Sequence, residues 1–148
     1  MKNKKSKVVI LTGGSGLLGA SIATKLIEGG AICINADIIN STPNLASYFI
    51  ECDITNEESI KSLLNRVISK YGQVDALINN AYPRTSDWGN KFEEVTQDSW
   101  KQNIDLQLNS YFSITQQVAL KMIQQKSGSI LNIASIYGFL GPDFTVYE

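Results

Sequence analysis

Hydrophobic residues follow two alternating patterns along the chain: short unbroken runs, and longer stretches with helical spacing. The run at residues 8–11 is apolar at every position and ends at glycines, which is typical of a strand buried on both faces. Leu18, Ile22 and Leu26 then recur at helical spacing before Gly29 ends the segment. Similar apolar runs predict further strands at residues 31–36, 47–51, 74–78 and 129–134.

Two further stretches carry the spacing of amphipathic helices. Thr55 and Glu58 have the spacing of a capping box at the start of one, and apolar residues recur behind them as far as Tyr71. The other is a long helix predicted over residues 97–125. Strands that alternate with helices favour right-handed crossovers and a parallel sheet covered on both faces. The sequence therefore predicts one α/β domain over residues 1–148, a Rossmann-type doubly wound parallel sheet with strand order 3-2-1-4-5.

Composition and charge exclude several classes of function. The 148 residues carry 13 basic and 14 acidic side chains, so no excess of one sign favours nucleic acid or an anionic membrane as a partner. The sequence contains no histidine and no cysteine cluster, which argues against Ser-His-Asp catalysis and against a metal site within these residues. Cys33 and Cys52 each lie in an apolar run, as expected for reduced thiols in a cytoplasmic protein.

A glycine-rich segment, Thr-Gly-Gly-Ser-Gly-Leu-Leu-Gly at residues 12–19, joins the first predicted strand to the first helix. Gly13 and Gly16 lack a Cβ, so a pyrophosphate can approach the backbone of this turn closely. Gly19 lets the helix pack close to the sheet, and the N-terminus of that helix offers amide donors to phosphates. This context favours a dinucleotide site. The residues expected to contact the cofactor here are Thr12, Gly13, Ser15, Gly16, Leu17, Leu18 and Gly19.

An acidic residue, Asp37, closes the second predicted strand eighteen residues after Gly19. A carboxylate there accepts hydrogen bonds from the hydroxyls of the adenosine ribose and repels a 2′-phosphate. No Arg or Lys lies in the glycine loop or directly after Asp37 to bind such a phosphate. The sequence therefore favours NAD(H) over NADP(H), with Asp37 and Ile38 beside the cofactor. A glycine-rich turn followed by a surface acid is the alternative.

Beyond the glycine loop, the sequence resembles the short-chain dehydrogenase/reductase family along nearly its whole length. Residues 52–55, Cys-Asp-Ile-Thr, are similar to the family's strand-end segment whose acid meets the adenine amino group. The resemblance implies that Asp53 and Ile54 lie against the adenine. Asp is also common at the start of helices, so a cap of the following helix is the alternative role for Asp53.

Two other segments are similar to functional motifs of that family. Residues 75–81 resemble its Asn-Asn-Ala-Gly motif, and residues 128–135 resemble the strand that ends in the catalytic serine, here Ser135. Such sheets hold ligands at the carboxyl ends of their strands. Polar turn residues after buried strands are the alternative for both segments. The residues of the first segment and its neighbour that are implied to line the cofactor are Asn80, Ala81 and Tyr82.

The chain departs from the family pattern at three places. Tyr82 stands where the motif has its last glycine. Gln107 occupies the place of the family's catalytic Asn, which holds a water in the proton relay, and Gln reaches such a water from one methylene further out. Gly16 lies one place earlier than the glycine of many family dehydrogenases, a spacing closer to the epimerase/dehydratase branch.

The family's Tyr-x-x-x-Lys pair is missing from these 148 residues. In the family the tyrosine moves the substrate proton, and the lysine lowers the tyrosine pKa and holds the nicotinamide ribose. Tyr147 lies twelve residues after Ser135, one fewer than the usual interval, and no lysine follows it. The segment 135–148 is similar to a subgroup resembling flagellin-modification protein A, in which the pair comes later. We therefore expect an incomplete domain whose pair lies beyond residue 148, with Tyr147 as the less favoured candidate.

The predicted function is that of an NAD(H)-dependent oxidoreductase that interconverts a secondary alcohol and a ketone, on a sugar-like substrate by the subgroup resemblance. Two alternatives remain: a nucleotide-sugar epimerase or dehydratase, which the glycine spacing favours, and a non-catalytic dinucleotide sensor. A downstream Tyr-x-x-x-Lys pair would favour the enzyme over the sensor. The expected partners are a small-molecule substrate and further copies of the chain, with no nucleic acid and no membrane.

Overall fold

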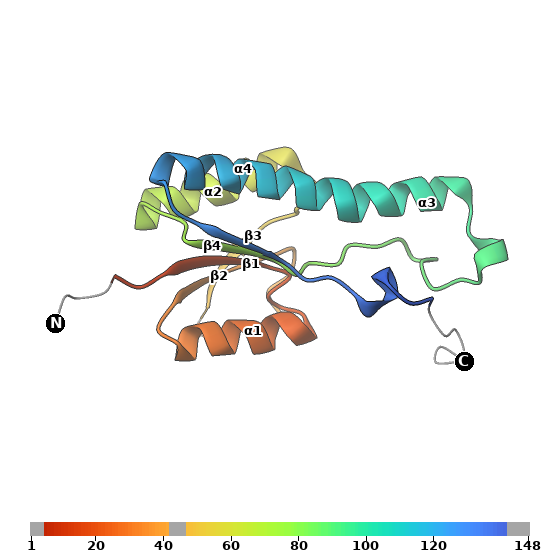
Figure 1. The fold of residues 1–148 in the computed structure, drawn as a ribbon, viewed down its shortest axis with the longest axis horizontal. Helices are drawn as coiled ribbons and strands as arrows, with labels where there is room; N and C mark the ends of the chain where they lie inside the picture. The colour runs from red at the N-terminus through yellow and green to blue at the C-terminus, as the bar shows by residue number, and fades with distance from the viewer. Residues whose placement is uncertain (1–4, 42–46, 142–148) are drawn as a thin grey trace.

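Five parallel strands form a single sheet in the order β3-β2-β1-β4-β5 (Figure 1). The computed structural model describes residues 5–41 and 47–141. The strands are β1 (Val8–Thr12), β2 (Ile32–Asp37), β3 (Tyr48–Glu51), β4 (Ala76–Asn79) and β5 (Ser129–Asn132). Their order and parallel pairing confirm the predicted Rossmann-type fold.

Helices cover both faces of the sheet, with α1 on one side and α2 and α4 on the other (Figure 1). Their bounds are α1 (Leu17–Glu28), α2 (Glu57–Tyr71) and α4 (Ser110–Gln125). Alternate residues of the central strand β1 serve the two faces: Val8 and Ile10 pack with α2 and α4, while Val9 and Leu11 pack with α1. None of these four side chains is more than 4% exposed. Burying each of them stabilises the fold by about 1.5–3 kcal/mol, so β1 is central to both cores.

The long predicted helix is present, but its hydrogen-bond pattern changes in the middle. α3 (Gln97–Ile104), a π-helical turn η2 (Asp105–Asn109) and α4 follow one another as one rod (Figure 1). The wider turn alters the pairing of backbone carbonyls, and the hydroxyl of Ser110 donates to the carbonyl oxygens of Leu106 at 2.5 Å and Gln107 at 3.1 Å. Turns of this kind inside α-helices occur frequently at functional sites.

The start of α2 differs from the predicted capping box. Asn56 is the N-cap, because its carboxamide oxygen accepts the N–H of Ser59 at 3.0 Å. Thr55 instead donates its hydroxyl to Asp53 at 2.7 Å. Asn is as good an N-cap as Ser or Thr, so the helix begins one residue later than expected. The prediction of a Thr55–Glu58 capping box is therefore wrong.

β4 and β5 have different bounds from the predicted strands. The backbone of Val74 pairs with a side chain before β4 begins: its N–H donates to Oε1 of Gln125 at 3.0 Å, and Nε2 of Gln125 donates to its carbonyl oxygen at 2.8 Å. At the other end, the N–H of Ile133 donates to the carbonyl oxygen of Asn79 at 2.9 Å. β5 ends at Asn132, the residue that pairs with Asn79 at the end of β4.

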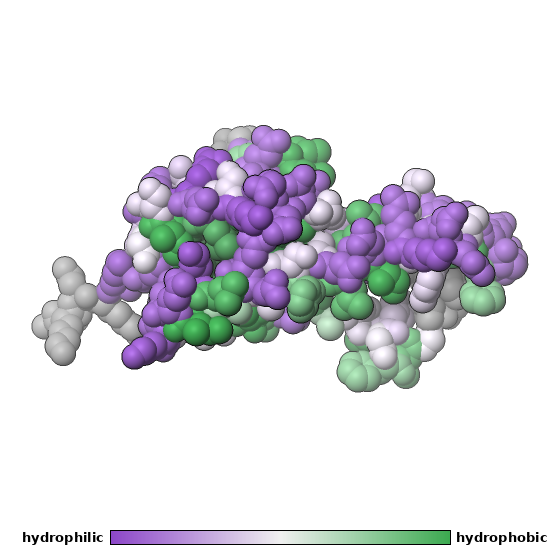
Figure 2. Space-filling model, turned by 90° about the horizontal axis from the view of Figure 1, so that it is seen from above, coloured by the Kyte–Doolittle hydropathy of each residue, from purple (hydrophilic) through white to green (hydrophobic). Residues whose placement is uncertain are grey.

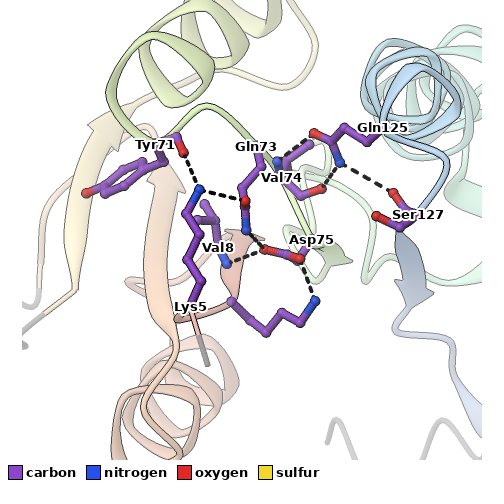
Figure 3. A network of polar contacts seen from close by, with 9 residues as sticks. Lys5, Val8, Tyr71, Gln73, Val74, Asp75, Gln125 and Ser127 are labelled. Atoms are coloured by element: carbon purple, nitrogen blue, oxygen red, sulfur yellow. Dashed lines mark hydrogen bonds and ion pairs between the residues drawn. The ribbon is translucent and has the colours of Figure 1, made fainter. Parts of the chain in front are cut away.

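A polar network joins the amino ends of β1 and β4 (Figure 3). The Asp75 carboxylate accepts the N–H of Val8 at 2.9 Å, the Lys7 ammonium at 2.7 Å and the Gln73 amide at 2.6 Å. Burial by itself raises the pKa of Asp75, but the three hydrogen bonds and the charge of Lys7 outweigh it and lower the pKa below its ordinary value. This network lies at the opposite edge of the sheet from the glycine loop, so it supports the fold at a distance from that loop.

The long helical rod exposes apolar side chains at regular intervals. Figure 2 looks down on the side of the molecule that carries α2 and α4, and shows hydrophilic residues over much of it with hydrophobic residues gathered between them. Trp100, Ile104, Leu108 and Phe112 recur four residues apart on the rod, and each is at least 40% exposed. Residues at this spacing share one face of a helix. We call these four residues the apolar stripe.

Candidate functional site

A cavity of about 890 Å³ opens at the carboxyl edge of the sheet, a volume in the range of small-molecule and cofactor sites. The turn between β1 and α1, the ends of β2 and β3, and the segment after β4 form its walls. The predicted cofactor residues that line it are Gly13, Ser15, Gly16, Leu17, Leu18, Gly19, Asp37, Ile38, Asp53, Ile54, Asn80, Ala81 and Tyr82. The fold therefore brings residues from four strand ends together in one cavity.

The glycine loop is shaped by backbone positions that exclude a side chain. Gly13 has a φ of +66°, and a Cβ there would lie 2.7 Å from the Cα of Ala81. A Cβ on Gly19 would lie 2.0 Å from the carbonyl oxygen of Gly13. Gly16, the N-cap of α1, provides no side-chain acceptor for the amides of the first turn. These amides lie at the positive end of the helix dipole, where they suit an anionic phosphate.

Thr12 does not line the cavity and instead holds the loop after β4 in place. Its buried hydroxyl oxygen accepts the N–H groups of Asn80 and Ala81, each at 3.0 Å. The side chain of Asn80 completes the connection, because its Nδ2 donates to the carbonyl oxygens of Thr12 at 3.1 Å and Gly13 at 3.0 Å. Thr12 was predicted to contact the cofactor; in the structure it is 0% exposed, and its hydroxyl positions the segment that does line the cavity.

The carboxylate of Asp37 is held at the edge of the cavity by two backbone amides. One oxygen accepts the N–H of Ser15 at 2.9 Å, and the other accepts the N–H of Ile38 at 2.8 Å. Asn35 supports the same loop from below, since its Nδ2 donates to Oγ of Ser15 at 3.0 Å. Asn35 is not among the residues predicted to form the site, although a polar side chain in the middle of an apolar strand indicates a special role. The acid is thereby oriented before any ligand binds.

Asp53 lines the cavity but does not cap α2, since the N-cap of that helix is Asn56. One of its oxygens accepts both the N–H of Thr55 at 2.9 Å and the Thr55 hydroxyl at 2.7 Å. Its neighbour Cys52 is 2% exposed at the cavity floor, and burial raises the pKa of that thiol. The acid therefore shapes the turn before α2 and also presents polar oxygen to the cavity.

Two side chains brace the end of β4. Asn79 is fully buried, and its Nδ2 donates to Oγ1 of Thr115 on α4 at 3.0 Å and to Oδ1 of Asn132 on β5 at 2.8 Å. The hydroxyl of Tyr111 donates to the carbonyl oxygen of Ala81 at 2.6 Å. Burial, and to a smaller extent Tyr82, raises the pKa of Tyr111, which keeps the phenol protonated as a donor. Asn79 is thus a bridge between three elements rather than a turn residue.

Two of the predicted catalytic residues, Ser135 and Gln107, are not among the residues that line the cavity. Ser135 is exposed and comes three residues after β5, and its Oγ accepts the N–H of Tyr137 at 3.2 Å. Gln107 is half-buried in the π-helical turn, next to the cavity-lining Leu106. Tyr147 lies outside the described residues. The structure therefore brings most of the predicted cofactor residues together in one cavity, and Ser135 and Gln107 lie outside its lining.

The segment after β4 adds a side chain that the sequence did not indicate. Arg84 lines the cavity, and its guanidinium lies 4.8 Å from the ring centroid of Trp88 and 5.7 Å from that of Tyr82. Nothing in the local pattern distinguished this arginine from an ordinary surface charge. Only the return of the chain to the carboxyl edge places it at the cavity.

Two classes of site have no counterpart among residues 5–41 and 47–141. No group of three His, Cys, Asp or Glu side chains there could hold a metal ion. Within the same residues, no helix is both long enough and apolar enough to cross a membrane.

A family model described as short chain dehydrogenase matches residues 7–148. The chain is 26% identical to the post-translational flagellin modification protein A of Campylobacter coli, over 97% of this chain and 61% of that protein. It is 31% identical to the L-fucose dehydrogenase of Bos taurus, over 91% of this chain and 51% of that protein. The solved structure of NAD⁺-bound xylitol dehydrogenase superposes with a TM-score of 0.80 at 26% identity, covering 97% of this chain and 59% of the other. Although it spans only about half to three-fifths of the length of these relatives, the chain belongs to the short-chain dehydrogenase family.

Proposed function

We propose that this protein is an NAD(H)-dependent oxidoreductase that interconverts a secondary alcohol and a ketone. The observation that carries the proposal is the cavity at the carboxyl edge, where the glycine loop and the oriented carboxylate of Asp37 meet. Parallel α/β sheets bind dinucleotides at this place. When bound, the nicotinamide ring accepts or donates the hydride, and the protein orients the reactants and manages the proton.

The cofactor-side residues fit the successive parts of a dinucleotide. The free amides at the start of α1, from Leu17 to Gly19, would hold the pyrophosphate. Asp37 would accept the ribose hydroxyls, and Asp53 would face the adenine. The segment after β4 would lie along the remaining part of the cofactor, with Asn80 holding that segment against the glycine loop.

The charge of the cavity favours NAD(H) over NADP(H). A 2′-phosphate would meet the negative carboxylate of Asp37 at the end of β2. Arg84 is the only basic residue among the cavity-lining residues that the structure describes, and it follows β4 rather than β2. No lining cation therefore lies at the ribose end to offset the repulsion.

On the substrate side, Ser135 would donate a hydrogen bond to the reacting oxygen. Its Oγ already accepts the N–H of Tyr137, which leaves the hydroxyl proton for a substrate acceptor. Gln107 in the π-helical turn would hold a water for proton transfer in place of the usual Asn. Tyr147 is the less favoured base, because an unassisted tyrosine titrates near pH 10 and needs a nearby cation to act at neutral pH.

The names of two relatives support a proposal for the substrate class. The names of the L-fucose dehydrogenase and the xylitol dehydrogenase point to a sugar or a polyol. We propose a polyhydroxylated substrate of this kind. The two unpaired thiols, Cys33 and Cys52, are buried and support a reducing, cytoplasmic setting.

Calorimetry with NAD and NADP tests the cofactor assignment, and NADH formation from sugars and polyols tests the reaction. We expect NAD to bind more tightly than NADP, and at least one polyhydroxylated alcohol to reduce NAD. A preference for NADP would contradict the role of Asp37. Tight NAD binding without turnover of any such alcohol would favour the sensor over the enzyme.

The apolar stripe supports the proposal that copies of the protein associate. Trp100, Leu108 and Phe112 are each more than 60% exposed, an arrangement that is costly on a monomer surface. Sedimentation of the protein should show a dimer or larger species. Replacement of Leu108 and Phe112 by Glu should shift that species toward the monomer.

A further inference from the structure

Residues 82–88 belong to the segment that follows β4, and they give the cavity a positive charge at one end. Arg84 is the only Lys or Arg among the cavity-lining residues that the structure describes. The lining acids, Asp37 and Asp53, belong to the ends of β2 and β3, on the other side of β1 from β4. The cavity is therefore acidic at its ribose end and cationic at the end nearest β4.

Two aromatic rings hold the guanidinium of Arg84. Its central carbon lies 4.8 Å from the ring centroid of Trp88 and 5.7 Å from that of Tyr82. The two rings meet edge to face, with centroids 5.9 Å apart and an angle of 87° between their planes. A cation–π contact uses none of the N–H donors of a guanidinium for a hydrogen bond, so an arginine held in this way can still donate to a planar anion.

The loop around Arg84 is anchored to α3. The N–H of Thr85 donates to Oδ1 of Asn103 at 3.1 Å, and Nδ2 of Asn103 donates back to the Thr85 hydroxyl at 2.6 Å. The acid of the loop, Asp87, accepts the Ser99 hydroxyl at 2.7 Å, and hydrogen bonds from Thr85 and Ser99 lower its pKa. Asp87 is thus engaged by α3. None of the ion pairs found among residues 5–41 and 47–141 includes Arg84.

We propose that Arg84 binds an anionic group of the substrate, a carboxylate or a phosphate, so that acidic hydroxy compounds are preferred over neutral polyols. The inference rests on the proposed function, in which NAD lies along the glycine loop and residues 80–82 and leaves the space beside Arg84 to the substrate. A guanidinium donates two parallel hydrogen bonds to such a group. Arg84 is a binding residue in this scheme and moves no proton.

Fluorescence of Trp88 provides a direct test, because its ring contacts the guanidinium. The chain has two tryptophans, and a Trp100→Phe background removes the other signal. The NAD-saturated protein is titrated with D-gluconate, sorbitol 6-phosphate and neutral sorbitol. We expect at least one of the anions to bind about tenfold more tightly than sorbitol, the scale of a charge-assisted hydrogen bond. Arg84→Gln should remove that preference, and Arg84→Lys should keep part of it.

Arg66→Gln is the matched control, since Arg66 is the only other arginine and lies on α2 outside the cavity lining. It should leave the preference for the anion unchanged. Equal binding of the anions and sorbitol to the unmodified protein would overturn the inference, as would a preference that survives Arg84→Gln. Weaker NAD binding by Arg84→Gln in calorimetry would assign Arg84 to the cofactor pyrophosphate instead. Failure of the unmodified protein to bind NAD would contradict the proposed function itself.

Discussion

The glycine-loop region and the region after β5 lie at the same edge of the sheet, yet they are held in different ways. Around the glycine loop, the buried Thr12 hydroxyl and the Asn80 amide join β1 to the segment after β4 through four hydrogen bonds. After β5, Ser135 is exposed and caps a single short turn. Leu11 on β1 is 0% exposed, whereas Leu131 on β5 is 52% exposed.

This difference separates the proposed cofactor-binding residues from the proposed catalytic serine in physical terms. The loop that would hold the cofactor is built on the central strands, so its geometry is stabilised by the same packing that stabilises the fold. Ser135 follows a strand that pairs on one side only among the described residues. Regions with few buried contacts open locally at lower free energy. The position of Ser135 should therefore depend on contacts other than those of the buried core.

The largest expected effect concerns the region after β5. Ser135→Ala removes the hydroxyl that would bind the reacting oxygen, and we expect kcat to fall about 10²- to 10³-fold. The affinity for NAD should not change, because the cofactor cavity does not include Ser135. Steady-state kinetics and calorimetry measure the two quantities. Ser129→Ala, at the opposite end of β5, is the control and should leave kcat unaltered.

The next effect concerns the hydrogen bonds that hold the glycine-loop region together. Thr12→Val keeps the shape of the side chain but removes the acceptor of the Asn80 and Ala81 amides. Two partly buried donors then lack a partner, and the free energy of unfolding should fall by about 1–3 kcal/mol. Affinity for NAD should fall as well, because the segment after β4 lines the cavity. Denaturant melts and calorimetry test both expectations.

Gln125→Ala is the matched control for Thr12→Val. Gln125 also satisfies backbone groups, those of Val74, but at the opposite edge of the sheet (Figure 3). Its loss should lower stability while leaving the affinity for NAD unchanged, and Thr12→Ser should restore much of both. Equal loss of NAD affinity in the two variants would mean that the affinity follows overall stability rather than the Thr12 contacts.

A smaller effect sharpens the cofactor assignment. Asp37→Asn keeps an acceptor for the Ser15 amide while it removes the negative charge. The ratio of NAD to NADP affinity should fall about tenfold, since both the ribose hydrogen bonds and the repulsion of a 2′-phosphate weaken. Calorimetry with both cofactors measures the ratio. An unchanged ratio would show that Asp37 does not discriminate between the adenosine riboses of NAD and NADP.

The smallest effect lies far from the cavity, at Asp75. Its folded pKa is below the ordinary value, so its ion form contributes stability above the unfolded pKa near 4. That contribution is lost as the pH falls from about 4 through the folded pKa. Asp75→Asn should therefore flatten the acid limb of the stability profile. NAD affinity at neutral pH should be unaffected, and an acid limb identical to that of the unmodified protein would contradict the assignment.

Most of the fold could be predicted from the sequence because the local spacing of apolar residues indicates each strand and helix. Apolar runs of strand length and stretches of helical spacing indicated the five strands, their order and the covering helices. The errors fall at element ends. Thr55 fits a capping pattern, yet the neighbouring Asp53 takes its hydroxyl and leaves the cap to Asn56. At such ends several side chains can bond to the same backbone groups. The three-dimensional arrangement decides which of them forms the hydrogen bond.

The sequence by itself determined the Rossmann-type sheet and the glycine loop, together with the acid that follows it, because these depend on residues close together in the chain. Only the tertiary structure decided that Thr12 supports the cavity instead of lining it, and that Arg84 reaches the cavity at all. The bond from Asn80 to Thr12 joins residues 68 positions apart. Contacts of that separation depend on how β1 and β4 pair and on the path of the chain beyond them, which neither segment specifies alone.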